Sequence, residues 1–207
     1  FEYNNQGKWF VYDTNLSKLE NYDFVILRID RPVTSEFLKF LTSNFPKEKI
    51  INSPDGMMLT GSKEFLLNFP SLCPPMKICK SIEDVEDFKE KYSMVLKPLE
   101  DYGGRGLIKI ENNEVIEDEV KYDYNDYRVI LKEKVKRKYL AMKFLKNVTK
   151  GDKRVIVING KVMGATLRLP PLGSYICNLS KGGSSSYAEV TDDEIDITNK
   201  ISPLIIK

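Results

Sequence analysis

The stretch SMVLKPLEDYGGRGLIKI, residues 93–110, predicts two apolar β-strands that flank a glycine-rich loop. The first strand ends at Lys97, the loop covers 102–106, and the second strand covers 107–110. Glycine adopts positive φ and leaves backbone N–H groups uncovered, so the loop can direct amides at an anion, to which Lys97 would add a charge. The local pattern fits a phosphate-binding loop and an ordinary β-hairpin equally well.

The composition describes a globular chain with little net charge. The 207 residues are 42% hydrophobic, which is enough for a packed core in one large domain or two small ones. Lys and Arg number 32 against 30 Asp and Glu, and the net charge of +2 predicts neither a nucleic acid nor a membrane as partner. Any anion binding is therefore expected to be local.

The absence of histidine and the few cysteines restrict the chemistry. Cys73, Cys79 and Cys177 are an odd number without metal-ligand spacing, so neither a disulfide framework nor a zinc site is expected. Without histidine, Ser-His-Asp and Cys-His nucleophilic catalysis are excluded. No membrane span or signal peptide is visible, which predicts a cytoplasmic protein. The chain begins at Phe1 rather than a methionine, and we expect it to be part of a longer protein.

Residues 1–53 predict the end of a parallel α/β unit. Apolar runs predict strands at 8–13, 22–28 and 48–53, and a turn follows at Ser53-Pro54-Asp55-Gly56. A helix is predicted behind Pro32, with Thr34 as its cap and with a buried face that consists of Phe37, Leu38 and Leu41. Strands that alternate with helices favour a parallel sheet.

Residues 54–138 surround the glycine-rich loop. A short helix around 62–68 carries Lys63, and Pro74-Pro75 begins an extended segment. Two further helices are predicted from apolar stripes, which are Ile82, Val85 and Phe88 behind the cap Ser81, and Tyr127, Leu131 and Val135. The basic run 132–138 fits an anion-binding patch or a solvated helix face. We favour the solvated face, because Glu133 interrupts the run and no aromatic residues interleave.

Residues 139–207 contain the clearest structural signal. A strand is predicted at 139–145, and 152–169 form a hairpin around Asn159-Gly160, the dipeptide that a type I′ turn prefers. The charged residues at the ends of this hairpin are either surface charges or the lining of a cleft. The segment 181–187, KGGSSSY, predicts a flexible polar loop.

Six segments occur in a fixed order that is specific when they are taken together. They are Lys63 on its short helix, KPLEDYGG (97–104), AMKFL (141–145), GDKRVIVING (151–160), LRLP (167–170) and NLSKGG (178–183). This order resembles the bacterial glutathione synthetase family of the ATP-grasp superfamily, from about Tyr22 to the end of the chain.

The resemblance implies the α/β (α+β) class with an ATP-grasp fold. Residues 1–53 would be the end of an N-terminal α/β domain. Residues 54–138 would be the first half of the ATP-grasp fold with its phosphate loop, and 139–207 the second half, which ends before the metal-binding strands. Mg²⁺ ligands are expected beyond Lys207, and none is assigned within the chain.

The resemblance also implies an ATP-dependent carboxylate–amine ligase. In this family a carboxylate attacks the γ-phosphate of ATP, and an amine then displaces phosphate from the acyl phosphate to form an amide. The substrates would be small molecules, γ-glutamylcysteine and glycine, and family members often form homo-oligomers.

The site residues follow from the same resemblance. The positions that match nucleotide-binding residues are Lys63, Lys97, Tyr102, Gly103, Gly104, Met142, Lys143, Phe144, Leu145 and Asp152. The positions that match catalytic residues are Arg154, Arg168 and Asn178.

Two positions depart from the family pattern. Ile176 stands where glutathione synthetases usually carry an arginine beside the substrate, and Met142-Lys143 stands where they more often have a polar pair beside adenine. These departures keep two alternatives open. One is an ATP-grasp ligase for another amino acid or peptide, and the other is a nucleotide-binding protein without ligase activity.

Overall fold

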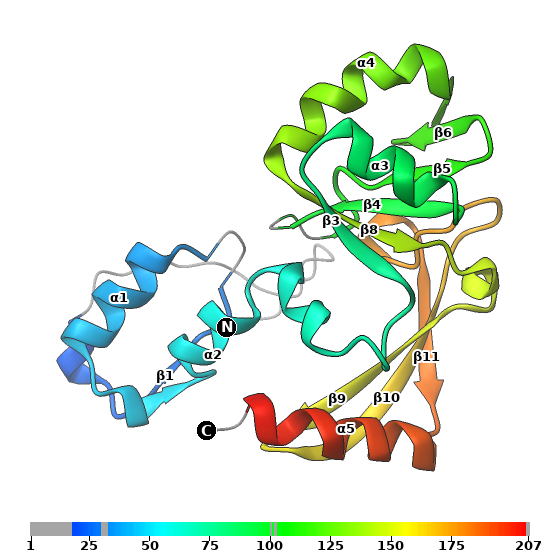
Figure 1. Cartoon of the computed structure of the whole chain (residues 1–207). Coiled ribbons are helices and arrows are strands. Elements are labelled where there is room, and N and C mark those ends of the chain that lie inside the picture. Colours follow the sequence, from blue (N-terminus) through cyan, green and yellow to red (C-terminus); the bar gives the residue numbers. More distant parts are fainter. Residues whose placement is uncertain (1–17, 30–32, 100, 102, 206–207) are drawn as a thin grey trace, which may run out of the picture. The chain divides into compact units, whose positions relative to one another are not determined.

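The computed structural model describes residues 18–29, 33–99, 101 and 103–205. The chain divides into two compact units, Phe1–Met57 and Met58–Lys207, and each is described by itself (Figure 1). The predicted strand at 8–13, the break at Pro32 and the loop residue Tyr102 lie outside the described residues. Among the described residues, no helix is both long and apolar enough to cross a membrane.

The first unit is a short α/β segment. Its elements are η1 (Leu19–Asn21), β1 (Val25–Ile26), α1 (Ser35–Asn44), η2 (Lys47–Lys49), β2 (Ile50–Ile51) and the start of α2 (Pro54–Thr60). β1 and β2 pair in parallel, with Val25 opposite Ile50, as predicted. The helix α1 begins behind Thr34, whose Oγ1 accepts a hydrogen bond from the N–H of Phe37 at 3.2 Å.

The strands of this unit are shorter than predicted, and the buried face of its helix α1 contains fewer residues than predicted. β1 and β2 cover two residues each instead of the predicted 22–28 and 48–53. Leu38 and Leu41 are buried, but Phe37 is 38% exposed. The buried stripe of α1 therefore runs along Leu38 and Leu41 alone.

The predicted turn at 53–56 is wrong, because these residues begin the helix α2. The Oγ of Ser53 accepts a hydrogen bond from the N–H of Gly56 at 3.3 Å, and its carbonyl accepts one from Met57 at 2.8 Å. Pro54 is the first helical residue, where a missing N–H costs nothing. The Ser-Pro pair thus starts a helix.

The second unit contains a six-stranded antiparallel sheet. Its strands are β3 (Met76–Cys79), β4 (Met94–Pro98), β5 (Ile108–Glu111), β6 (Glu114–Glu117), β7 (Val120–Asp123) and β8 (Tyr139–Lys143). They lie in the order β3-β8-β4-β5-β6-β7. The predicted strands on either side of the glycine-rich loop are confirmed as β4 and β5, and the predicted strand at 139–145 is confirmed as β8.

Helices pack on this sheet as the apolar stripes predict. They are η3 (Lys63–Asn68), α3 (Ile82–Lys89), α4 (Tyr124–Lys134) and η4 (Val135–Arg137), and α3 and α4 cover one face (Figure 1). The predicted stripes are buried, and they consist of Ile82, Val85, Phe88, Tyr127, Leu131 and Val135. Ser81 caps α3 by accepting a hydrogen bond from the N–H of Asp84 at 3.3 Å. The basic run 132–138 is mostly exposed.

The two faces of the sheet have separate cores. The core under α3 and α4 includes alternate residues of β4 and β5, namely Met94, Leu96, Ile108 and Ile110. A smaller core lies on the opposite face and contains Val95, Leu99, Leu140 and Met142, with Leu66 of η3 against it. Successive residues of a strand point to opposite faces, so Lys97 lies with Val95 on this second face.

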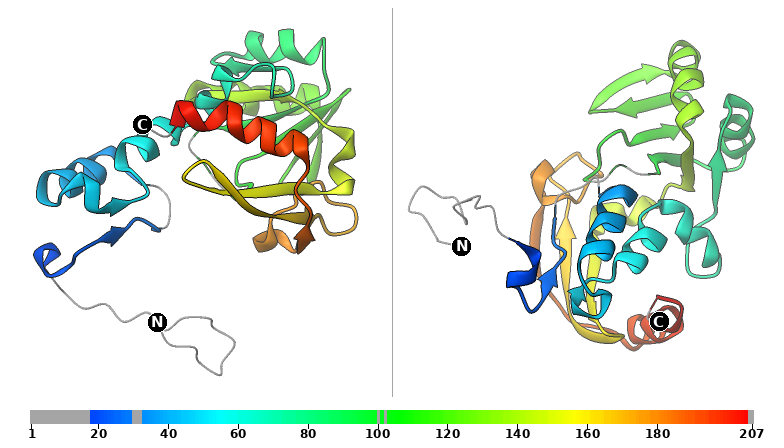
Figure 2. Two further views of the ribbon diagram at one scale, coloured as in Figure 1. Left: turned by 90° about the horizontal axis from the view of Figure 1, so that it is seen from below. Right: turned by 90° about the vertical axis from the view of Figure 1, so that its left-hand side faces the viewer.

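A three-stranded antiparallel sheet follows in the chain. Its elements are η5 (Lys146–Lys150), β9 (Asp152–Ile158), β10 (Lys161–Leu169), η6 (Leu179–Lys181), β11 (Ser184–Ala188) and α5 (Asp192–Ile205), with strand order β11-β10-β9. The predicted hairpin is confirmed, and Asn159 and Gly160 have φ of 49° and 75°, as a type I′ turn requires. Figure 2 shows α5 along the β9–β10 hairpin.

The predicted polar loop at 181–187 is wrong in its second half. Ser184–Ala188 form β11, which pairs with β10 so that Ser185 lies opposite Arg168. The serine-rich composition indicates a loop, but the free backbone edge of β10 supplies hydrogen-bond partners that composition does not reveal. The α/β (α+β) class is confirmed, while the predicted division between 54–138 and 139–207 stays a prediction.

Candidate functional site

Lys97 is a largely desolvated cation on the second face of the six-stranded sheet. It lies near the end of β4, opposite Leu140 of β8. Its Nζ lies 3.5 Å from the sulfur of Met142, and it forms no salt bridge with any other described residue. Burial lowers the pKa of the Lys97 ammonium, an effect that the nearby Cys73 opposes. A desolvated cation without a carboxylate partner is costly until an anion binds it.

Lys63 is tied to the same end of β4 by a different set of partners. Its Nζ donates to the carbonyl oxygens of Pro98 at 2.6 Å and Leu99 at 3.3 Å, and also to that of Asp101. Its backbone N–H donates to the Leu99 carbonyl at 3.2 Å. The structure therefore brings the two predicted lysines to one strand end, where Lys63 anchors the junction between strand and loop.

The glycine-rich loop lies against the segment 174–178. All three described loop glycines have positive φ, as predicted, and they are Gly103, Gly104 and Gly106. A Cβ on Gly104 would stand 3.2 Å from the Cγ2 of Ile176 and 3.7 Å from the Oδ1 of Asn178. Gly104 and Asn178, both predicted site residues, are thus neighbours, and the side chain of Ile176 lies beside them.

The charged ends of the β9–β10 hairpin share one face. Arg168 lies opposite Asp152, and Arg154 is two residues further along β9, so all three point the same way. The Nε of Arg168 donates to Asp152 Oδ1 at 2.8 Å, and an Nη donates to the second oxygen. Asp152 raises the pKa of Arg168. Lys153 points the other way, 2.8 Å from Glu194 of α5, so α5 covers the opposite face.

The residues expected beside adenine divide between the faces of the six-stranded sheet. Met142 is buried in the core of the second face, and Phe144 packs against that core. Lys143 points to the other face, with its Nζ 5.5 Å from the ring centroid of Tyr92. Leu145 is 55% exposed. The structure thus groups Met142 and Phe144 with Lys97, and it does not bring the Lys143 side chain to them.

Two side chains at this site were not predicted from the sequence. Lys109 of β5 lies opposite Val95 and therefore on the second face, with its Nζ 4.3 Å from the ring centroid of Phe144 and 5.8 Å from that of Tyr175. The rings of Phe144 and Tyr175 meet edge to face, 6.1 Å apart. The pattern Ile-Lys-Ile at 108–110 contains the signal for Lys109, since a lysine between two buried isoleucines must point to the other face. No motif signals Tyr175.

The arrangement suits a ligand rich in anionic oxygens. One part is the second face of the six-stranded sheet, the other is the Arg168 face of the three-stranded sheet, and the segment 174–178 contacts the first part. Lysines, arginines and loop amides all favour phosphate or carboxylate groups. Among the described residues, no group of three or more Cys, Asp or Glu side chains is placed to hold a metal ion, and the three cysteines are free thiols.

Known proteins match most of this chain. The family described as prokaryotic glutathione synthetase, ATP-grasp domain, matches residues 62–207. The glutathione synthetase of Bradyrhizobium diazoefficiens is 28% identical over 191 residues, which cover 90% of this chain and 59% of that protein. The glutathione synthetase of Buchnera aphidicola subsp. Acyrthosiphon pisum is 27% identical over 219 residues, which cover 98% of this chain and 63% of that protein. The chain thus spans less than two thirds of the length of these relatives.

Solved structures show the same fold. D-cycloserine synthetase DcsG matches 83% of this chain and 61% of its own, with a TM-score of 0.59 and 12% identity. The ATP-grasp ligase PsnB, solved with a minimal precursor, Mg and ADP, matches 82% of this chain and 49% of its own, with a TM-score of 0.53 and 18% identity. At these identities the likeness concerns the fold alone, and it confirms the predicted ATP-grasp fold.

Proposed function

This chain belongs to the prokaryotic glutathione synthetase ATP-grasp family, and from that premise we propose that the protein containing it is an ATP-dependent carboxylate–amine ligase. The relatives named glutathione synthetase support this reaction class. ATP would bind on the second face of the six-stranded sheet, with its adenine near Met142 and Phe144. Its phosphates would lie between Lys97 and the glycine-rich loop.

The environment of Lys97 is the observation that carries the nucleotide-binding part of this proposal. Its ammonium is desolvated, its pKa is lowered, and no carboxylate among the described residues neutralises it. A structural lysine on an apolar face would pair with an acidic side chain or extend to water. Lys97 pairs with no acidic side chain among the described residues and its ammonium is largely desolvated, so a phosphate group that reaches it gains a partner that has already lost much of its water.

The proposed reaction has two steps and needs no protein nucleophile. A substrate carboxylate oxygen attacks the γ-phosphorus of ATP, the bond to the β-phosphate oxygen breaks, and ADP leaves behind an acyl phosphate. The amine nitrogen of the second substrate then attacks the acyl carbon, phosphate departs, and the nitrogen loses a proton as the amide forms. Positioning and charge neutralisation carry such a transfer, which agrees with a chain that has no histidine.

The hairpin face supplies the arginines for these steps. Asp152 already engages two nitrogens of Arg168 and so fixes the plane of its guanidinium. The remaining N–H groups of Arg168 and the exposed fork of Arg154 would face the acyl phosphate. Asn178, which lies beside Gly104, would hydrogen-bond from the edge of the loop.

Magnesium would neutralise phosphate charge, as it does in ATP-grasp ligases. We assign none of its ligands to the described residues, which contain no suitable acidic cluster. The expectation that the ligands lie beyond Lys207 stays a prediction.

Ile176 favours a second candidate for the substrate. The family pattern places an arginine here, whereas this chain places an aliphatic side chain against Gly104. An aliphatic group offers no anchor for a substrate carboxylate, so a ligase for another amino acid or peptide competes with γ-glutamylcysteine plus glycine.

ADP release by the complete protein distinguishes these candidates. We expect ATP turnover that depends on both a carboxylate and an amine substrate, and a panel of amino acids and dipeptides is compared with γ-glutamylcysteine plus glycine. Turnover with the latter pair alone assigns a glutathione synthetase, and turnover with other pairs alone assigns the second candidate. ATP binding without turnover on any pair would contradict the ligase.

A further inference from the structure

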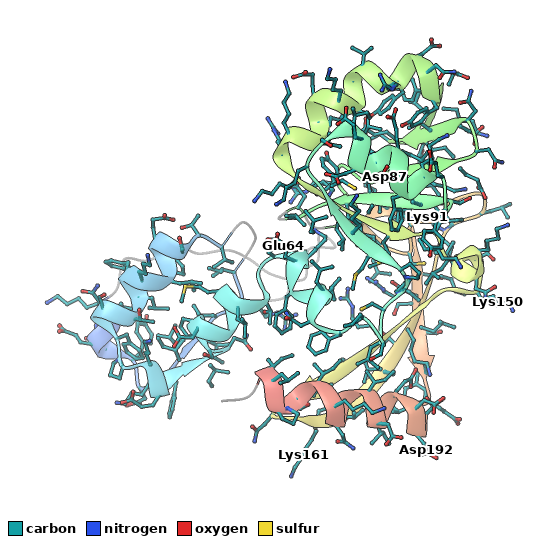
Figure 3. All side chains as sticks on the ribbon, viewed as in Figure 1. Glu64, Asp87, Lys91, Lys150, Lys161 and Asp192 are labelled. Atoms are coloured by element: carbon teal, nitrogen blue, oxygen red, sulfur yellow. The ribbon has the colours of Figure 1, made fainter. Side chains whose placement is uncertain are left out.

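A cavity of about 530 Å³ opens at the end of β4 and the start of β8. One part of its lining is the turn between α4 and β8, where Lys136, Arg137 and Lys138 follow one another. Another part contains Asp101 and Glu64, which is labelled in Figure 3. Basic side chains and carboxylates thus come from different elements and line one cavity.

These opposite charges do not pair with one another. Lys136 is engaged by Glu133. The other four charged side chains form no salt bridge with another described residue, and they are Arg137, Lys138, Glu64 and Asp101. Charges of both signs that line a cavity of this size without bridging it leave room for a ligand that carries both charges itself.

The backbone of Lys138, which lines the cavity, has an unusual conformation. Lys138 has φ 61° and ψ 128°, a conformation that glycine adopts freely and that other residues adopt with strain. The turn therefore carries a strained lysine, and that lysine lines the cavity.

We propose that this cavity binds a zwitterionic amino acid or short peptide. The guanidinium of Arg137 presents forked donors that suit an α-carboxylate, and Lys138 adds a second cation beside it. Glu64 and Asp101 accept hydrogen bonds from an α-ammonium group. The two carboxylates would repel a purely anionic ligand, and the basic turn would repel a purely cationic one.

Capped peptides test this chemistry on the chain as it stands. Gly-Gly, N-acetyl-Gly-Gly and Gly-Gly-amide are titrated separately and followed by amide chemical shifts, with glycine as the free amino acid. We expect Gly-Gly to bind about tenfold more tightly than either capped peptide, because each cap removes one charge-assisted contact. Equal affinities for all three, or no binding, overturn the proposal. Glycine binding as tightly as Gly-Gly assigns the site to free amino acids.

Two substitutions assign the two ends of the ligand. Arg137→Ala should abolish the preference for a free carboxylate, so that Gly-Gly and Gly-Gly-amide bind equally. Glu64→Gln should weaken the preference for a free amino group in the same way. Lys161→Ala, at the exposed hairpin end, is the matched control and should leave every affinity unchanged. An Arg137→Ala variant that keeps the full preference overturns the assignment.

The cavity also shares residues with the Lys63 anchor, which connects it to the nucleotide. The carbonyl groups that hold Lys63 belong to Pro98, Leu99 and Asp101, and all three residues line the cavity. A bound peptide would fix this backbone and keep Lys63 on it. This step rests on the proposed function, and we expect saturating Gly-Gly to weaken ATP binding at least fivefold, a typical coupling.

The two failures can be told apart. If ATP does not bind with or without peptide, the proposed function fails while the peptide result stands. If ATP binds with the same affinity at saturating peptide, the cavity is uncoupled from the nucleotide and this part of the inference is wrong.

Discussion

The two sheets of the unit Met58–Lys207 place a cationic side chain in opposite environments. On the six-stranded sheet, Lys97 meets the sulfur of Met142 and apolar neighbours, and burial lowers its pKa. On the three-stranded sheet, Arg168 is held by both oxygens of Asp152, which raises its pKa. Among the described residues Lys97 thus has no carboxylate partner, whereas Arg168 is already paired with one.

The difference separates binding from positioning. A desolvated cation without an anionic partner destabilises the folded state, and an anionic ligand that binds it removes this destabilisation. A cation held by a bidentate carboxylate contributes to stability and keeps a fixed orientation. We therefore expect Lys97 to determine nucleotide affinity, and Arg168 to affect stability and turnover more than affinity.

Gly151→Ala should have the largest effect, on the three-stranded sheet. Gly151 has φ 95°, and a Cβ there would stand 2.5 Å from the carbonyl oxygen of Arg168. Strain and overlap together should lower the free energy of unfolding by about 3 kcal/mol or more, measured by urea denaturation. Gly173→Ala is the control, since it has φ 80° but no atom within 4 Å of its Cβ. Equal losses in both variants would show that the close contact is unimportant.

Asp152→Ala should have an intermediate effect, because it leaves the guanidinium of Arg168 without its partner. We expect a loss of about 1.5–3 kcal/mol in unfolding free energy, the range for hydrogen bonds to charged groups. The double variant Asp152→Ala/Arg168→Met should recover part of that loss, since no unpaired charge remains. If the single variant is as stable as the original protein, the pair does not stabilise the sheet.

Lys97→Met should have a smaller effect of the opposite sign. Removing a desolvated charge should raise the unfolding free energy by about 1 kcal/mol at neutral pH. Because the folded-state pKa of Lys97 lies below its ordinary value, the unfolded chain holds more protons between these two pKa values, and stability should rise with pH in that window. The rise should be absent in Lys97→Met and retained in Lys161→Met. A destabilised Lys97→Met would contradict the comparison.

The sequence predicts much of this site where side-chain alternation decides it. The buried stripe of β4 and β5 and the Asn159-Gly160 turn place Lys97 and the hairpin correctly. The pairing of Arg168 with Asp152 depends instead on the register of the two strands. The register of β9 and β10 shifts between Val162 and Gly164, and without this bulge Arg168 would face residue 151 and point to the other side. Gly164 lies at this shift, and a glycine inside a strand often marks a bulge, but it does not determine which residues pair beyond it.

Contacts between segments far apart in sequence were also beyond prediction. Tyr175 meets Phe144 and Lys109 only because the fold brings 174–178 against the six-stranded sheet. The described partners of the Lys63 ammonium include three backbone carbonyls, which any sequence supplies. Motif matching identifies such a lysine but does not predict its hydrogen-bond partners.

Nucleotide binding to this chain tests the central claim most directly. ATP affinity is measured by calorimetry for the original chain, for Lys97→Met and for Lys161→Met. We predict that Lys97→Met weakens binding by about 1.5–3 kcal/mol, the range for a charged hydrogen bond, although it is at least as stable as the original chain. Lys161→Met should bind normally. ATP affinity unchanged by Lys97→Met would contradict the account, because the desolvated cation would then have no part in holding the phosphates.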